Sequence, residues 1–103
     1  MLKDIHYYEL ENGSAPVQKW LNSFKDIKTK ARIKNDISKL RIGLGDTKSL
    51  KDGLFELRIF YGKGYRVYFT EKDNRIILLL TAGDKSTQSK DIATAKEYLK
   101  GLN

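Results

Sequence analysis

Four ionisable side chains in the second half of the chain are of the types that bind and cleave a phosphodiester. Arginine guanidinium groups bind phosphate oxygens in a bidentate manner. A lysine close to two arginines can exchange protons near neutrality. These groups suit RNA cleavage, in which the 2′-hydroxyl attacks the adjacent phosphate while the protein aligns it and stabilises the added charge. The predicted catalytic residues are Arg58, Arg66, Lys85 and, as the acidic candidate for a general base, Glu56.

A structural interpretation of the same residues stays open. Arg58 and Arg66 could be exposed sheet cations paired with Glu56 or Glu71, and such pairs contribute roughly 0–1 kcal/mol to stability. Lys85 could be a loop or helix-capping residue. The sequence alone does not decide between ion pairs and phosphate ligands.

A second group of residues is predicted to contact the RNA chain. From Lys28 to Arg41 there are six cations and one acid, Asp36. This run is either a solvated helix face or an electrostatic footprint for phosphate or for an acidic partner. Tyr68 is either an ordinary strand residue or a platform on which a base stacks. The predicted RNA-binding residues are Lys28, Lys30, Arg32, Lys34, Lys51 and Tyr68.

Three strands between Leu54 and Lys85 must position the predicted catalytic residues. Two of them alternate apolar and polar side chains, which predicts one buried and one open face. The third, Ile76 to Leu80, is apolar throughout and is expected to be covered on both faces. The apolar members of the first two strands are expected to face the helices; they are Phe55, Leu57, Ile59, Tyr65, Val67 and Phe69.

The turn between the first two of these strands decides where the arginines point. A three-residue loop, Gly62-Lys63-Gly64, would need a left-handed residue at its end, and Gly64 supplies it. This loop would pair Tyr61 with Tyr65 and Arg58 with Tyr68. Since directly paired residues share a face, Arg58 and Arg66 would then lie on the same side of the sheet.

The remaining elements are expected to be one strand and three helices. The first strand lies within Asp4 to Glu9, and the helices cover residues 15–25, Ile27 to Ile42 and 89–100. The predicted order is β-α-α-β-β-β-α, an α+β fold with a mostly antiparallel sheet and the helices packed on one face. We expect one domain over residues 1–103.

Composition limits the functional classes. The formal net charge is +7, which favours a polyanionic partner but also fits a basic domain with no such role. There are no cysteines, so disulfides and thiolate zinc ligation are not available. With no signal peptide and no apolar run of about 20 residues, a cytoplasmic protein is expected. No metal-ligand pattern is present, and no metal or cofactor is predicted.

The stretch from Leu54 to Gln88 strongly resembles the RelE/ParE superfamily of toxins from toxin–antitoxin systems. It is most similar to the HigB-like branch, often described as phage Gp49-like or addiction module killer proteins. The matching pieces are the ELR strand (Glu56-Leu57-Arg58), the GYRVYF strand (Gly64 to Phe69), the apolar strand before Lys85 and Thr87-Gln88, and the PVQKWL helix start.

This resemblance implies a RelE-like fold and a metal-independent endoribonuclease that cleaves mRNA on the ribosome and inhibits translation. It also implies a cognate antitoxin, expected to be a DNA-binding helix-turn-helix protein, and it maps the functional cations onto Arg58, Arg66 and Lys85. The chain departs from the best-studied members of the family in two ways. Glu56 and Arg58 stand where a pair of lysines can occur, and no tyrosine follows Lys85 before Tyr98, although some members place a catalytic tyrosine there. The alternatives are a ParE-like gyrase inhibitor and a non-catalytic basic nucleic-acid-binding module.

Overall fold

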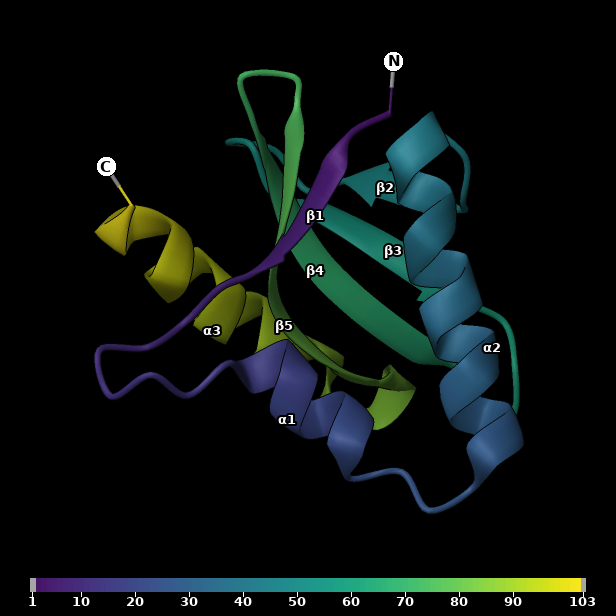
Figure 1. Cartoon of the computed structure of the whole chain (residues 1–103). Helices are drawn as coiled ribbons and strands as arrows, with labels where there is room; N and C mark the ends of the chain where they lie inside the picture. The colour runs from purple at the N-terminus through teal and green to yellow at the C-terminus, as the bar shows by residue number, and fades with distance from the viewer. Residues whose placement is uncertain (1, 103) are drawn as a thin grey trace.

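The computed structural model describes residues 2–102, which form a five-stranded sheet and three α-helices (Figure 1). Two short 3-10 helices, η1 and η2, complete the fold. In chain order the elements are β1 (Asp4–Tyr7), α1 (Pro16–Asn22), α2 (Ile27–Ser38), η1 (Lys39–Ile42), β2 (Thr47–Ser49), β3 (Phe55–Ile59), β4 (Tyr65–Lys72), β5 (Ile76–Asp84), η2 (Lys85–Thr87) and α3 (Gln88–Gly101).

The sheet has the strand order β1-β5-β4-β3-β2. β1 runs parallel to β5, and the other neighbours are antiparallel. This confirms a mixed α+β fold with a mostly antiparallel sheet. β2 was not predicted, because its three residues, Thr47–Ser49, are all exposed and polar and show no apolar alternation. None of the helices within residues 2–102 has the length and apolarity to span a membrane.

Helices cover both faces of the sheet, so the prediction that they pack on one face is wrong. On one face, Val17 and Leu21 of α1 and Ile33 of α2 join the main core with β3, β4 and β5. On the other face, Ala95 of α3 packs with Tyr68 and Leu80. In Figure 1, α3 lies behind β5, away from α1 and α2. The apolar run of β5 is therefore buried on both sides, as predicted.

The β3–β4 hairpin places the arginines on one face, although its register differs from the predicted one. Ile59 pairs with Tyr65 and Arg58 pairs with Arg66, so the loop has five residues, Phe60–Gly64. The register is shifted by two residues from the prediction. Because side chains alternate with a period of two, a shift of two residues leaves every side chain on its predicted face. Gly64 has φ +85°, as the predicted left-handed residue should.

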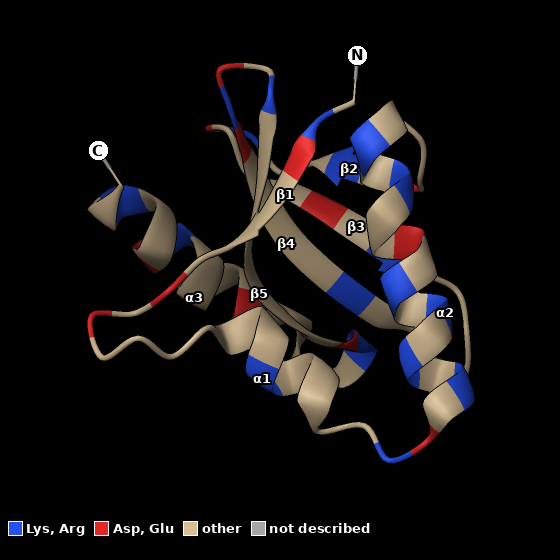
Figure 2. Cartoon of the chain, in the orientation of Figure 1, with Lys and Arg blue, Asp and Glu red and all other residues tan. Residues whose placement is uncertain are grey.

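α2 and η1 form one nearly continuous basic element. Asp26 caps α2 by accepting a hydrogen bond from the backbone N–H of Lys28, and Gly43 ends η1 in a left-handed conformation. Figure 2 shows Lys and Arg positions, in blue, along much of α2. The helix predicted from Ile27 to Ile42 is confirmed, with its last turn tightened to a 3-10 helix.

Candidate functional site

One cavity at the end of the β3–β4 hairpin brings together three of the predicted catalytic residues. Its volume is about 330 Å³. The strands contribute Arg58 and Arg66, and η2 contributes Lys85. A fourth cation, Lys63, comes from the hairpin loop. We call this hollow the cation cavity; it is lined by Arg58, Ile59, Phe60, Tyr61, Gly62, Lys63, Gly64, Tyr65, Arg66 and Lys85.

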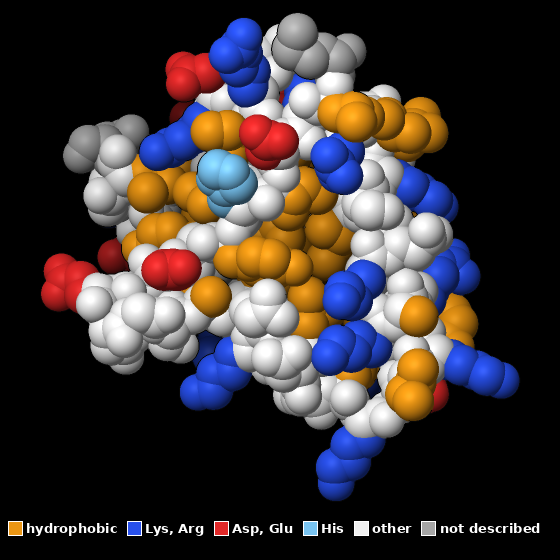
Figure 3. All heavy atoms as spheres, viewed as in Figure 1, with side chains coloured by type: hydrophobic (Ala, Val, Ile, Leu, Met, Phe, Trp, Pro, Cys, Tyr) orange, Lys and Arg blue, Asp and Glu red, His pale blue; other side chains and the backbone are white. Residues whose placement is uncertain are grey.

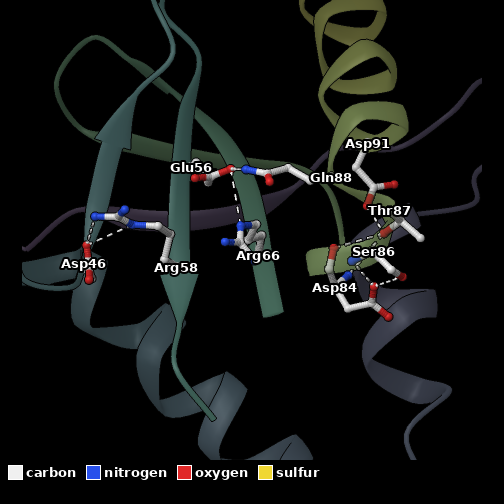
Figure 4. Close-up of polar contacts among 9 residues, drawn as sticks. All are labelled: Asp46, Glu56, Arg58, Arg66, Asp84, Ser86, Thr87, Gln88 and Asp91. Carbon is white, nitrogen blue, oxygen red and sulfur yellow. Dashed lines mark hydrogen bonds and ion pairs between the residues drawn. The ribbon is translucent and has the colours of Figure 1, made fainter. Parts of the chain in front are cut away.

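Arg58 is held by an aspartate that lies just before β2. Its Nη2 and Nε donate to Asp46 Oδ1 at 2.7 and 3.2 Å. The Arg58 guanidinium carbon also lies 5.8 Å from the centroid of the Phe60 ring. Figure 4 shows the contact with Asp46. Together the two contacts fix the direction of the Arg58 side chain at the rim of the cation cavity. The structural interpretation paired Arg58 and Arg66 with Glu56 or Glu71. For Arg58 this is wrong, because Asp46 is its partner; for Arg66 the pairing with Glu56 is confirmed.

Arg66 is oriented by Glu56, which is almost completely enclosed. Only 1% of Glu56 is exposed, and its Oε2 lies 3.7 Å from Arg66 Nε. The same oxygen accepts a hydrogen bond of 2.8 Å from Gln88 Nε2 in the first turn of α3 (Figure 4). Glu56 was predicted on an open face as a general base. α3 closes over that position, so Glu56 lies where it can orient Arg66 but is shielded from a bound substrate.

Lys85 is held at the cation cavity by its backbone. Its N–H donates to the carbonyl of Gly64 in the hairpin loop at 3.3 Å, and Asp84 caps η2 through Ser86 and Thr87. The hydrogen bond from the Ser86 hydroxyl lowers the pKa of Asp84, and Lys63 at 3.2 Å adds to this effect. The Lys85 side chain is exposed and makes no ion pair with any described residue.

The charges of the cation cavity are only partly compensated. Asp46, Glu56 and Asp84 each lie beside one cation, which leaves Lys85 as the cation without a carboxylate partner among the described residues. A dianionic or monoanionic phosphate would therefore find one uncompensated charge and two oriented guanidinium groups. Within residues 2–102, no three His, Asp or Glu side chains gather as metal ligands would.

Tyr68 cannot serve as a base-stacking platform, because its side chain is fully buried beneath α3. Burial, followed by the charges of Glu56 and Asp91, raises the pKa of Tyr68 well above its usual range. Its hydroxyl has no hydrogen-bond partner among the described residues, although Glu56 is its neighbour on the paired strand. The predicted role of Tyr68 in stacking is corrected: it is a core residue.

An exposed aromatic ring outside the predicted set of RNA-binding residues lies at the cation cavity instead. Phe60 is 68% exposed and lines the cavity beside Arg58. The alternation of β3 already placed it on the same side as Arg58, so an exposed aromatic next to a predicted phosphate ligand was a signal in the sequence. Lys63 and Gln88 were also missed, because a loop cation and a helical amide carry no specific pattern.

The predicted RNA-binding cations of α2 divide into two rows on opposite sides of its buried face. Arg32 lies with its guanidinium carbon 5.5 Å from the centroid of the Tyr61 ring, next to the cation cavity. Lys28 is exposed one turn before it on the same side. Lys30 points toward α1, with its Nζ 3.3 Å from Asn22 Oδ1, and Lys34 follows one turn later. Only the Arg32 row borders the cation cavity.

Lys51 lies apart from the other predicted RNA-binding residues. It sits in the β2–β3 turn with φ +74° and lines a different cavity with Lys96 and Lys100 of α3. That turn is at the opposite end of β3 from Arg58. The structure therefore does not bring Lys51 to the cation cavity.

Comparison with known proteins supports the Gp49-like part of the resemblance noted in the sequence. Residues 19–100 match the model of the family described as "Phage derived protein Gp49-like (DUF891)". A protein of Haemophilus influenzae, described as uncharacterized, is 50% identical over 78 residues, which make up 75% of this chain and 79% of that protein. The family match contains every lining residue of the cation cavity.

Proposed function

Because the chain belongs to the family of phage-derived Gp49-like proteins, we propose that it is the toxin of a type II toxin–antitoxin system. Membership of this family is consistent with such a role. Within the toxins, the proposal places the chain in the RelE/ParE superfamily and its HigB-like branch. The support for this finer placement is the set of sequence motifs that border the cation cavity, ELR, GYRVYF and the lysine after β5.

The proposed activity is cleavage of mRNA on the ribosome. The observation that supports it is the meeting of Arg58, Arg66 and Lys85 in one cavity, with Lys85 uncompensated by any described carboxylate. Two oriented guanidinium groups can hold the non-bridging oxygens of a phosphate and stabilise the charge that develops there. Phe60 at the rim offers an exposed ring on which the neighbouring base can stack.

In this proposal Lys85 is the proton-transfer residue and Glu56 is a positioning residue. The 2′-oxygen forms a bond to phosphorus as it loses its proton to solvent water, and the bond between phosphorus and the 5′-oxygen breaks as that oxygen takes a proton from Lys85. The products are a 2′,3′-cyclic phosphate and a 5′-hydroxyl, and Lys85 regains its proton from solvent. Lys85 suits this step because its side chain is exposed and unpaired among the described residues. Glu56 is enclosed and bonded to Gln88, so it acts by holding Arg66.

The proposed partners are mRNA, the ribosome and a cognate antitoxin, in the cytoplasm. The antitoxin is proposed to be a DNA-binding protein with a helix-turn-helix fold. The net charge of +7 favours both polyanionic RNA and an acidic partner.

Growth of cells that express the chain from an inducible promoter tests the proposal. Expression of the wild-type chain should stop growth, and the double variant Arg66→Ala/Lys85→Ala should restore it. As a matched control, Lys90→Ala/Lys96→Ala removes two exposed α3 cations outside the cation cavity and should stay toxic. Equal toxicity of both double variants would remove the cation cavity from the mechanism. Intact mRNA together with gyrase-linked DNA damage would select a gyrase inhibitor instead.

A further inference from the structure

Three of the most exposed large apolar side chains gather around η1, far from the cation cavity. Leu2, Ile42 and Leu44 are 59%, 58% and 55% exposed. Leu2 and Ile42 line one hollow of about 380 Å³, and Leu44 lines a second of about 200 Å³. The two hollows share Lys3 and Gly43, so the three side chains form one surface. Single exposed apolar residues are common, but a contiguous group marks an interaction surface.

The surface has an apolar floor and a rigid rim. We call it the η1 patch; its floor is made by Leu40, Phe55, Phe69 and Ile77. Figure 3 shows apolar side chains at the surface between β1 and α2 on this face of the molecule. The two sides of the rim are tied by the bond from Lys3 N–H to the Arg41 carbonyl, at 2.9 Å, and by the bond from Arg41 Nε to the Lys3 carbonyl, at 3.2 Å. The hollow is therefore formed before any partner binds.

The rim of the η1 patch is basic. Glu71 is the one acid among the described residues that line its two hollows, and it is paired with Lys3. Arg41 makes no ion pair with any described residue. By helical spacing, Lys30 and Lys34 lie on the same side of α2 as Arg41 and extend the basic rim toward α1. A second copy of the chain would bring like charges together, which disfavours self-association at this surface.

We propose that the η1 patch is the docking surface for an amphipathic helix of a protein partner, apolar on one side and acidic on the other. Such a helix would place its apolar side chains against Leu2, Ile42 and Leu44 and its carboxylates against Arg41 and Lys34. This inference rests on the proposed function in one respect: the partner is taken to be the cognate antitoxin. It also explains two predicted RNA-binding residues, Lys30 and Lys34, that lie away from the cation cavity.

A helix docked on the η1 patch leaves the cation cavity open. Glu71 borders the patch and Arg66 lines the cation cavity, and they are five residues apart on β4. At about 3.3 Å per strand residue, the two sites are roughly 17 Å apart. The partner would therefore bind without covering Arg58, Arg66 or Lys85.

Binding of two synthetic helical peptides to the purified chain tests the proposal without any measurement of RNA cleavage. Both peptides carry leucines on one side; the first carries glutamates on the other side and the second carries lysines. We expect the glutamate peptide to bind at least tenfold more tightly than the lysine peptide. Ile42→Asp and Leu44→Asp should each weaken its binding tenfold or more. Ile27→Asp is the matched control, because Ile27 is 82% exposed and lies outside the patch; its Kd should stay within about twofold of wild type.

A measurement on the wild-type chain removes any dependence on how the variants fold. Amide chemical-shift changes caused by the glutamate peptide should centre on Leu2, Ile42 and Leu44 and spare Gly62 and Gly64. Equal binding of the two peptides, shift changes centred on the hairpin loop, or a wild-type dimer that Ile42→Asp converts to monomers would each overturn the proposal. If the wild-type chain arrests growth but does not bind the glutamate peptide, only the docking surface is overturned. If it binds the peptide but does not arrest growth, only the proposed function is overturned.

Discussion

Gln88 Nε2 of α3 donates a 2.8 Å hydrogen bond to Glu56 Oε2 of β3, and this bond links the last helix to the cation cavity. Glu56 is enclosed, and the same oxygen lies 3.7 Å from Arg66 Nε. A buried carboxylate needs hydrogen-bond donors, because its charge is costly to remove from water. The first turn of α3 therefore stabilises the carboxylate that orients Arg66.

Removal of the Gln88 amide should destabilise the fold. Gln88→Ala removes the amide that donates a hydrogen bond to the buried Glu56 carboxylate. We expect the free energy of unfolding, measured by urea denaturation, to fall by about 1–3 kcal/mol. Ser89→Ala is the control, because Ser89 is exposed at the next position of the same helix. A Gln88→Ala variant as stable as Ser89→Ala would show that this hydrogen bond does not stabilise Glu56.

The close approach of α3 to β5 requires the glycine at position 83. A Cβ at Gly83 would overlap Asp91 Oδ2 and Thr87 Oγ1, which are bonded to each other at 2.5 Å. Gly83→Ala should therefore lower the free energy of unfolding by roughly 1–3 kcal/mol and displace η2 with Lys85. Gly101→Ala meets no atom within 4 Å and lies in a helix, so thermal denaturation should show an unchanged or raised Tm. Equal Tm values for the two variants would contradict the predicted overlap.

Asp84 should make the stability of the chain depend on pH in the acid range. Its pKa is lowered in the folded state, first by the Ser86 hydroxyl. A group with a lowered folded pKa stabilises the fold above its unfolded pKa, about 3.9, and loses this contribution as the pH falls through the folded pKa. Asp84→Asn should therefore be less stable than wild type at pH 7, and the difference in urea midpoint should close as the pH falls below about 4.

Lys63→Met separates the two causes of the lowered Asp84 pKa. It removes the ion pair at 3.2 Å but keeps the Ser86 hydrogen bond, which is the larger cause. We therefore compare Lys63→Met with the double variant Lys63→Met/Asp84→Asn. Their difference in urea midpoint should depend on pH nearly as strongly as the difference between wild type and Asp84→Asn. A difference that is constant from about pH 7 to about pH 2 would contradict the role of the Asp84 charge.

Phe60, and not Tyr68, should contribute to RNA affinity. Phe60→Ala removes an exposed ring at the cation cavity and should weaken binding of a short single-stranded RNA by about 1–3 kcal/mol, which is roughly 5- to 150-fold in Kd. Phe60→Tyr keeps the ring and should bind nearly as wild type. Tyr68→Phe removes a buried hydroxyl that has no hydrogen-bond partner among the described residues. It should leave the Kd for the RNA unchanged and the free energy of unfolding unchanged or higher. Loss of affinity in Tyr68→Phe, with Phe60→Ala unaffected, would reverse this assignment.

The faces of the strands could be predicted from the sequence, because a period of two survives an error in loop length. The three-residue loop was wrong by two residues, yet Arg58 and Arg66 still share a face as predicted. Their direct pairing could not be predicted, since it depends on how Phe60 and Tyr61 leave the strand. The exposed strand Thr47–Ser49 gave no hydrophobic signal at all.

The burial of Glu56 and Tyr68 could not be predicted from strand alternation. Alternation showed that they lie on the face opposite the main core, and that face was interpreted as open. The apolar run of β5 and the apolar side of α3, with Ile92 and Ala95, together required a second core on that face. Joining those two signals would have placed α3 over Tyr68. The long-range partners Asp46 and Gln88 depend on packing and have no local pattern.

Proton transfer by Lys85 is the central step of the proposed mRNA cleavage, and mapping of cut sites in a purified translation system tests it most directly. The wild-type chain should cut ribosome-bound mRNA, and Lys85→Met should cut about 10²- to 10⁴-fold more slowly. Lys90→Met, which changes an exposed lysine of α3 outside the cation cavity, should cut as wild type. Uncut mRNA with the wild-type chain, or equal rates for wild type and Lys85→Met, would contradict this role of Lys85.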